Sequence, residues 1–215
     1  EKKITNKTVF VIEASSYQLE YSKLFRSNIS LILNISPDHL ERHKTINKYV
    51  NAKFKLIKNQ SKEDLAILNT KNFYIRKELK SKNFLPKIIK IKKKIDSNFL
   101  KRINNQYFYT DGNKENLRFI IEVAKILKIK KNSLIKTLKK FKGLKYRQEI
   151  IFHSKKLTII NDSKATTFSS SVSLLRSLNN VHWIVGGQAK KGDKLSLSKK
   201  NCKSIKAYVF GTNKN

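Results

Sequence analysis

Apolar runs alternate with amphipathic stretches along the first seventy residues. Three short runs rich in β-branched residues, Thr8–Ile12, Ile29–Ile35 and Leu65–Asn69, are typical of buried strands. Ser15 and Ser16 can cap a helix over Tyr17–Leu24, and Thr45 begins a helical pattern that continues to about Lys58. Strands that alternate with helices predict an α/β unit with a parallel sheet.

The pattern is less regular between residues 70 and 110. This stretch favours short strands and turns, with Lys87–Ile95 and Gln106–Thr110 as the best strand candidates. Two amphipathic helices are predicted next, over Glu115–Ile129 and Asn132–Phe141, and Gly143 ends the second.

A domain boundary is predicted near Arg147–Ile150, which divides the chain into residues 1–148 and 149–215. The second part again alternates strands with a helix, so it reads as the beginning of another α/β unit. The predicted strands are Glu149–Phe152, Leu157–Asn161, Val181–Val185 and Ile205–Phe210, and the predicted helix is Phe168–Leu178.

The composition indicates a globular chain with an unusually basic surface. Of the 215 residues, 39% are hydrophobic, 48 are Lys or Arg and only 15 are Asp or Glu, so the net charge is +33. This charge leaves open a basic nucleic-acid-binding α/β module. However, the lysines are spread over the whole chain rather than clustered with arginines and aromatic residues, so we expect a solvated basic surface and no nucleic-acid partner.

Other features of the composition bear on compartment and completeness. Cys202 is the single cysteine, which excludes a disulfide framework and fits a reducing compartment. No apolar run approaches the roughly 18 residues of a membrane span, so we expect no membrane insertion. The sequence has no methionine, and we expect it to be an internal piece of a longer chain.

Polar residues follow the first two predicted strands. Glu13 ends the first, and Asp38 and His39 follow the second. The carboxyl ends of parallel strands meet at one edge of a sheet, where α/β proteins place their chemistry. These residues are candidates for binding Mg²⁺ or handling phosphate. Alternatively, Glu13 caps the next helix and His39 is a plain loop residue.

Lys53 lies on the apolar side of the helix predicted from Thr45, at i+4 from Tyr49 and i+3 from Val50. A lysine there either extends its amine to water or is buried with a lowered pKa. A buried neutral amine is a nucleophile and can add carbon dioxide to form an anionic carbamate. The spacing leaves both outcomes open.

Two loops could bind anions. The segment Asn161–Thr166 lies between a predicted strand and a predicted helix, where backbone donors accumulate. Gly187 and Gly192 have the spacing of a phosphate loop, but Asp193 and Lys194 stand where such a loop needs Lys and Ser or Thr. We therefore reject this loop as an ATP phosphate cradle.

Five segments, in order, resemble motifs of the Mur ligase family. The segment NDSKAT resembles the D-glutamate-adding branch of the family. The five segments are Glu13–Glu20 (EASSYQLE), Asn34–Arg42 (NISPDHLER), Tyr49–Lys53 (YVNAK), Gly143–Arg147 (GLKYR) and Asn161–Thr166 (NDSKAT).

The resemblance implies the later part of a central ATP-binding domain, a parallel sheet with helices, followed by the first part of a Rossmann-like C-terminal domain. The implied reaction joins D-glutamate to UDP-N-acetylmuramoyl-L-alanine through an acyl phosphate, at the expense of ATP, as a cytoplasmic step of peptidoglycan synthesis. The expected enzyme is a monomer. The Walker-type loop would precede Glu1, so this piece alone is expected to be inactive.

The resemblance also implies roles for single residues. Glu13 would bind one Mg²⁺ and His39 a second, one of these two sites would include a carbamylated Lys53, and Lys53, His39 and Lys164 would serve catalysis. The family pattern is not complete, since Gly112 and Tyr146 stand where it has His, Thr167 where it has Asn, and Tyr17 where it has Phe. The remaining expected contacts are Asn113 and Asn116 with adenine, Arg147 and Asp162 with the ATP phosphates and ribose, Ser15 and Gln18 with the nucleotide sugar, and Lys164, Thr166 and Lys190 with the reacting carboxylates.

Overall fold

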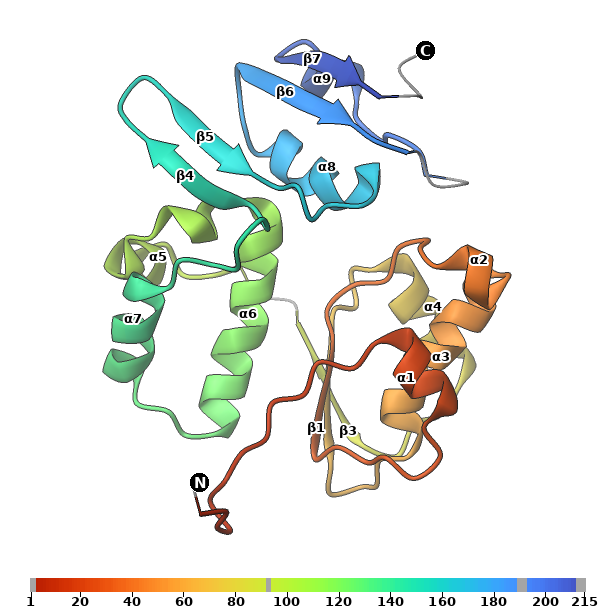
Figure 1. The fold of residues 1–215 in the computed structure, drawn as a ribbon. Helices are drawn as coiled ribbons and strands as arrows, with labels where there is room; N and C mark the ends of the chain where they lie inside the picture. Colours follow the sequence, from red (N-terminus) through yellow and green to blue (C-terminus); the bar gives the residue numbers. More distant parts are fainter. Residues whose placement is uncertain (1–2, 92–93, 189–192, 212–215) are drawn as a thin grey trace. The chain divides into compact units, whose positions relative to one another are not determined.

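The computed structural model describes residues 3–91, 94–188 and 193–211. The chain forms two compact units, Glu1–Lys90 (unit 1) and Ile91–Asn215 (unit 2), which are drawn in Figure 1. Unit 2 thus groups residues 91–148 with the segment that follows them. The predicted division of the chain into family domains at residue 148 is a separate matter and stays a prediction.

Unit 1 is built on a parallel three-stranded sheet in the order β1-β2-β3. The strands are β1 (Ile29–Ile32), β2 (Leu65–Leu68) and β3 (Lys87–Lys90). Ile29 pairs with Leu65, and Leu65 pairs with Lys87, so the strands run in register. The parallel sheet predicted from the alternating pattern is confirmed.

Four helices accompany this sheet: α1 (Ser16–Tyr21), α2 (Leu40–His43), α3 (Ile46–Lys58) and α4 (Phe73–Ser81). The α3 helix begins after Thr45, whose hydroxyl accepts a hydrogen bond from the Lys48 backbone amide, as predicted. Its apolar face packs with the sheet in a core that includes Tyr49, Val50, Phe54, Ile57, Ile32, Ala66, Leu68 and Ile75.

The segment Thr8–Ile12 is not the buried strand that its sequence predicts. It has no regular secondary structure, and the side chain of Val11 is 95% exposed. The β-branched pattern reports the capacity to be buried, but a strand also needs a neighbour for its backbone groups. Within the described ranges, β1 pairs with β2 alone and no strand pairs with this segment.

The prediction of strands and turns between residues 70 and 110 is largely wrong. The α4 helix and α5 (Ser97–Ile103) lie there; of the strand predicted over Lys87–Ile95, β3 is present, and residues 92 and 93 lie outside the described residues. The predicted strand Gln106–Thr110 is the 3₁₀-helix η1 (Gln106–Tyr109), because the Asn105 side chain accepts a hydrogen bond from the Tyr107 amide and caps a helical turn.

Unit 2 begins with a small helical core. It contains α5, η1, α6 (Asp111–Ile126) and α7 (Lys131–Lys140), and the last two confirm the predicted amphipathic helices. Figure 1 shows α6 and α7 as neighbouring helices joined by a short turn. The buried side chains of this core are Phe99, Ile103, Phe108, Leu117, Ile135 and Leu138.

The strands predicted after residue 148 are all present. An antiparallel hairpin joins β4 (Glu149–His153) to β5 (Thr158–Asn161), and β6 (Val181–Gly186) pairs in parallel with β7 (Ile205–Phe210). The helices are α8 (Phe168–Arg176) and α9 (Lys199–Cys202). No helix in the described part of the chain is long and apolar enough to cross a membrane.

Candidate functional site

Lys53 is the centre of the candidate site in unit 1. Its side chain is half-buried on α3, and its Nζ lies 5.3 Å from the centroid of the Tyr49 ring. Burial lowers the pKa of the Lys53 amine, because the charged form loses water, while the carboxylates of Asp38 and Glu13 raise it. Burial is the largest of these effects, so the amine is neutral more often than an exposed lysine.

His39 lies next to Asp38 at the start of α2. Its backbone is in the left-handed region, with φ of 55°, and its backbone amide donates a hydrogen bond of 2.9 Å to Asp38 Oδ1. The ring is held on both sides: Nε2 lies 3.6 Å from Asp38 Oδ2, and Nδ1 lies 3.1 Å from the hydroxyl of Tyr17. Asp38 and His39 are adjacent in the sequence and follow β1, whereas the segment Thr8–Ile12 before Glu13 is not the strand that the argument from strand ends assumed.

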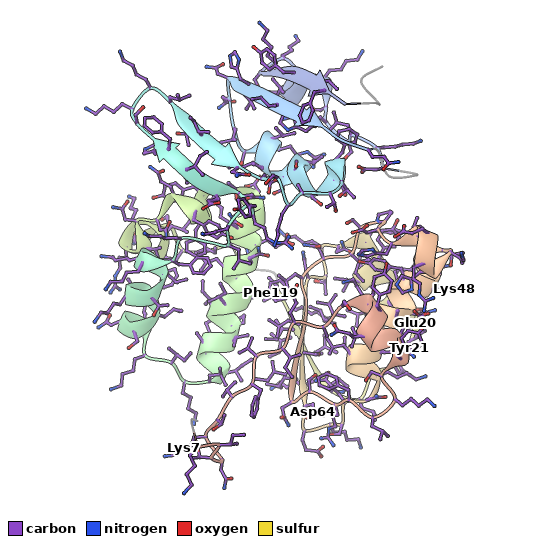
Figure 2. The ribbon with its side chains drawn as sticks, viewed as in Figure 1. Lys7, Glu20, Tyr21, Lys48, Asp64 and Phe119 are labelled. Atoms are coloured by element: carbon purple, nitrogen blue, oxygen red, sulfur yellow. The ribbon has the colours of Figure 1, made fainter. Side chains whose placement is uncertain are left out.

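The α1 helix places the segment after Glu13 beside α2. Glu20 and Tyr21, both labelled in Figure 2, lie at the end of α1. Arg42 of α2 contacts both, with its Nη2 3.3 Å from a Glu20 oxygen and hydrogen-bonded to the Tyr21 hydroxyl. At the other end, buried His43 pairs with buried Ser16 at 3.0 Å. These contacts fix α1 against the segment that carries His39.

Ser15 and Gln18 form the cap of α1. The Ser15 hydroxyl accepts a hydrogen bond of 3.2 Å from the backbone amide of Gln18, and Gln18 Oε1 accepts one of 2.8 Å from the backbone amide of Ser15. This reciprocal pair is a capping box, which explains where the helix starts. Glu13 is exposed and does not cap the helix, so its carboxylate is available for another role.

The residues around Lys53 have the donor chemistry of a magnesium site. Carboxylate oxygens suit a hard cation, and Mg²⁺ usually takes only one or two protein carboxylates, with water and phosphate oxygens as its other ligands. Among residues 3–91, 94–188 and 193–211, no cluster of three His, Cys, Asp or Glu side chains can hold a metal ion alone. The carboxylates of Glu13 and Asp38 therefore fit an ion whose remaining ligands are water and the oxygens of a bound phosphate.

A second group of expected site residues lies in unit 2, around Asp162. Asp162 Oδ1 accepts a hydrogen bond of 3.1 Å from the Gln148 amide, and Oδ2 accepts one of 3.2 Å from the Ser171 hydroxyl. Burial raises the pKa of the Asp162 carboxyl, whereas these two hydrogen bonds and the charge of Arg147 lower it. Arg147 is exposed and close enough to act on Asp162.

Asn113 is buried in the first turn of α6. Its Nδ2 donates to the Tyr107 carbonyl at 2.7 Å and to Gln148 Oε1 at 3.2 Å. Asn116 follows one turn later on α6 and is half-buried. Gln148 thus connects Asn113 with Asp162, a link that no sequence pattern indicated, because Gln148 lies in an irregular segment without periodicity.

The other expected residues lie in the loop after β5 or outside the described residues. Lys164 is exposed, and its backbone amide donates to the Tyr146 carbonyl at 3.0 Å. Thr166 is exposed in the same loop. Lys190 lies outside the described residues. The structure therefore brings together Glu13, Asp38, His39 and Lys53 in unit 1, and Asn113, Arg147 and Asp162 in unit 2.

Comparisons with known proteins find relatives that match most of this chain. The chain is 31% identical over 222 residues to the UDP-N-acetylmuramoylalanine–D-glutamate ligase of Rickettsia bellii, covering 94% of this chain and 49% of the relative. It is 34% identical over 221 residues to the same ligase of Fusobacterium nucleatum, covering 93% and 49%. The chain spans about half the length of the curated relatives it matches.

Solved structures show the same fold. The MurF ligase of Thermotoga maritima in complex with ADP has a TM-score of 0.58 at 14% identity, over 81% of this chain and 45% of that one. The UDP-N-acetylmuramate-alanine ligase MurC of the same organism has a TM-score of 0.57 at 18% identity, over 91% and 47%. The sequence profile of the Mur ligase middle domain matches residues 2–143. With two thirds of its length matched in this way, the chain belongs to the Mur ligase family.

Proposed function

We propose that this chain supplies part of the active site of a ligase that joins D-glutamate to UDP-N-acetylmuramoyl-L-alanine with ATP, a step of peptidoglycan synthesis. The observation that carries the proposal is the half-buried Lys53 amine, on which the carboxylates of Asp38 and Glu13 act. The similarity to D-glutamate ligases over more than nine tenths of the chain supports the choice of substrate.

The reaction needs an activated carboxylate, because a free carboxylate is a poor acyl donor. Transfer of a phosphoryl group from ATP gives an acyl phosphate, and the amino group of D-glutamate displaces phosphate from it. Negative charge gathers on phosphoryl oxygens during both steps, so stabilisation of this charge is the main task of the site. The expected site residues are suited to this task, since Arg147 and Lys164 are basic and the Glu13 carboxylate suits a hard cation.

Lys53 would act as a carbamate. Its lowered pKa makes the neutral amine available, and this amine attacks CO₂ to form an N–C bond with release of one proton. The product carries an anionic oxygen donor in place of a cation. Glu13 would hold one Mg²⁺ and His39 a second, with the Lys53 carbamate as a ligand in one of the two sites, and these ions would supply neutralisation of the charge on the transferred phosphoryl group.

The remaining residues would bind the substrates, as their motifs imply. In unit 2, Asn113 and Asn116 would contact adenine, while Arg147 and Asp162 would hold the phosphates and ribose of ATP. The substrate contacts would come from Ser15 and Gln18 for the nucleotide sugar, and from Lys164, Thr166 and Lys190 for the reacting carboxylates. We further propose that the complete enzyme is a cytoplasmic monomer, and that the 215-residue chain alone does not catalyse the ligation.

The test uses the complete protein in which this chain occurs. Phosphate release is measured with ATP, Mg²⁺, UDP-N-acetylmuramoyl-L-alanine and D-glutamate, with L-glutamate as the substrate control. Lys53→Met should lower kcat about 100-fold or more, the usual size of the loss when one charge-stabilising group is removed. The matched control is Lys48→Met, since Lys48 is exposed on the same helix and is labelled in Figure 2.

Two results would contradict the proposal. Equal turnover with L-glutamate would refute the substrate, and near-normal turnover of Lys53→Met would refute the carbamate. The alternative of a basic nucleic-acid-binding module rests on the net charge of +33. It predicts DNA or RNA affinity that falls steeply with salt in the absence of any ligase activity.

A further inference from the structure

Gln148 forms hydrogen bonds with the start of α6 and with the loop after β5, and so connects both with its own segment. Its side-chain Oε1 accepts from Asn113 Nδ2 at 3.2 Å and from the Thr110 hydroxyl at 3.1 Å, both at the start of α6. Its backbone amide donates to Asp162 Oδ1 at 3.1 Å, after β5. Because Asn113 and Asp162 are the residues expected at the two ends of the ATP nucleoside, Gln148 lies between both halves of that site.

The backbone of this segment is held in an uncommon conformation. Gln148 has φ of 48° and Tyr146 has φ of 66°, both in the left-handed region that side chains other than glycine seldom adopt. Such conformations persist only where surrounding contacts determine them. At Gln148 the contacts to Thr110, Asn113 and Asp162 supply this determination.

The hydrogen bonds fix the orientation of the Asn113 amide. The Tyr107 carbonyl can only accept, so the Asn113 atom that faces it at 2.7 Å is the nitrogen. The second hydrogen of this nitrogen is taken by Gln148 Oε1. Since both N–H groups are occupied and the amide is planar, Asn113 can offer a ligand only its oxygen, Oδ1.

An oxygen acceptor at this place distinguishes the purine bases. Adenine carries an amino donor, N6, where guanine carries the acceptor O6. A fixed Asn113 Oδ1 can accept from the adenine amino group but repels guanine O6. Without Gln148 Oε1, the second N–H of Asn113 would be free to donate to guanine O6.

We propose that Gln148 is a positioning residue that makes the site selective for adenine: its Oε1 takes the second N–H of the Asn113 amide, whose orientation the Tyr107 carbonyl already sets, so only the Asn113 oxygen is left for the base. The proposal rests on the proposed function, in which Asn113 contacts the adenine of ATP. Gln148 acts through Asn113 and touches no reacting atom, so it is not a catalytic residue. The neighbouring bond from its backbone amide to Asp162 is independent of the side chain.

Two variants separate the acceptor from the backbone role. Gln148→Met keeps the length of the side chain and the backbone amide but removes Oε1. Gln148→Glu keeps an acceptor oxygen in the same place. In the complete protein, kcat/KM is measured with ATP and with GTP, and the fluorescence of Trp183, which lies on β6 of the same unit, checks that each variant is folded.

The expected result is a change in base preference. The ratio of kcat/KM for ATP over GTP should fall about tenfold in Gln148→Met, which corresponds to about 1.4 kcal/mol. The loss should lie in KM for ATP, with kcat and KM for D-glutamate unchanged. Gln148→Glu should keep the ratio within about threefold of the wild type.

A merely structural role would lower both kcat/KM values in parallel. An unchanged ratio in Gln148→Met, or the same loss in Gln148→Glu, would overturn the proposal. Absence of ATP-dependent ligation in the wild type would instead refute the proposed function. In that case the hydrogen bond from Asn113 to Gln148 is tested directly by hydrogen exchange of the Asn113 side-chain amide in the 215-residue chain. Exchange should be faster in Gln148→Met than in the wild type and in Gln148→Glu. Equal rates in all three would refute the role of this hydrogen bond.

Discussion

Gln60 follows α3, the helix that carries Lys53, and holds three polar partners in the interior of unit 1. Its Nε2 donates to the carbonyl of Ser27 at 2.8 Å and to that of Leu65 at 3.0 Å. Its Oε1 accepts from the hydroxyl of Ser30 at 2.9 Å. Gln60 and Ser30 are each only 2% exposed, so water cannot replace these bonds without opening the structure.

Replacement of Gln60 by Leu removes all three bonds at nearly constant volume. Each bond contributes about 1 kcal/mol net, so Gln60→Leu should lower the free energy of unfolding of unit 1 by about 3 kcal/mol. Ser30→Ala removes one donor and should cost about 1 kcal/mol. In the double variant the Ser30 partner is already absent, so the loss should be about 1 kcal/mol smaller than the sum of the two single losses.

Urea unfolding followed by far-UV circular dichroism measures these changes. The single tryptophan, Trp183, lies in unit 2, so its fluorescence should keep its own midpoint while the transition of unit 1 moves to lower urea. Faster hydrogen exchange of the β2 amides in Gln60→Leu would locate the effect. A loss below about 1 kcal/mol, or strictly additive losses in the double variant, would refute the reasoning.

Three further predictions concern single side chains. Burial raises the pKa of Tyr49 to about 12, so Tyr49→Phe should remove a phenolate absorbance step near that pH, and loss of a step near pH 10 instead would contradict the burial effect. Gly143→Ala should destabilise unit 2 by more than Gly187→Ala, and urea unfolding followed by Trp183 fluorescence can measure the difference. Both glycines have positive φ, but a methyl group at Gly143 would overlap the Tyr107 ring, whereas nothing lies within 4 Å of one at Gly187. Lys53→Met should stabilise unit 1 at pH 7, because it removes the cost of burying the lysine charge. That cost is present below the lowered pKa of Lys53 and vanishes as the pH rises past the ordinary value of 10.5. Urea unfolding at pH 7 and 10 should therefore show a gain in the free energy of unfolding that shrinks with pH, and a gain that grows with pH would contradict the argument.

The sequence predicted best where periodicity is long. The apolar periodicity along α3 placed Lys53 on the buried face but left open whether its amine reaches water or is buried. In the structure the side chain is half-buried and the pKa of its amine is lowered. These results follow from local backbone geometry, which short-range patterns encode directly.

Predictions failed where structure depends on distant partners. Thr8–Ile12 has the composition of a strand, but a strand exists only with a neighbour. The α4 helix buries Ile75 alone, so its apolar pattern is weak. Gln148 and Thr110 are joined by a hydrogen bond although they lie 38 residues apart, and Gln148 has a left-handed backbone conformation. No local sequence pattern predicts such a long-range contact.

The exposed apolar side chains of Val9–Ile12 bear on how the protein behaves at high concentration. An extended run of this kind offers backbone and side-chain contacts to a second molecule, which favours self-association. The charge of +33 opposes this by mutual repulsion between molecules. Because dissolved ions shorten the reach of that repulsion to about 10 Å at 0.1 M, dilute buffers should keep the protein dispersed, and added salt should cloud the solution.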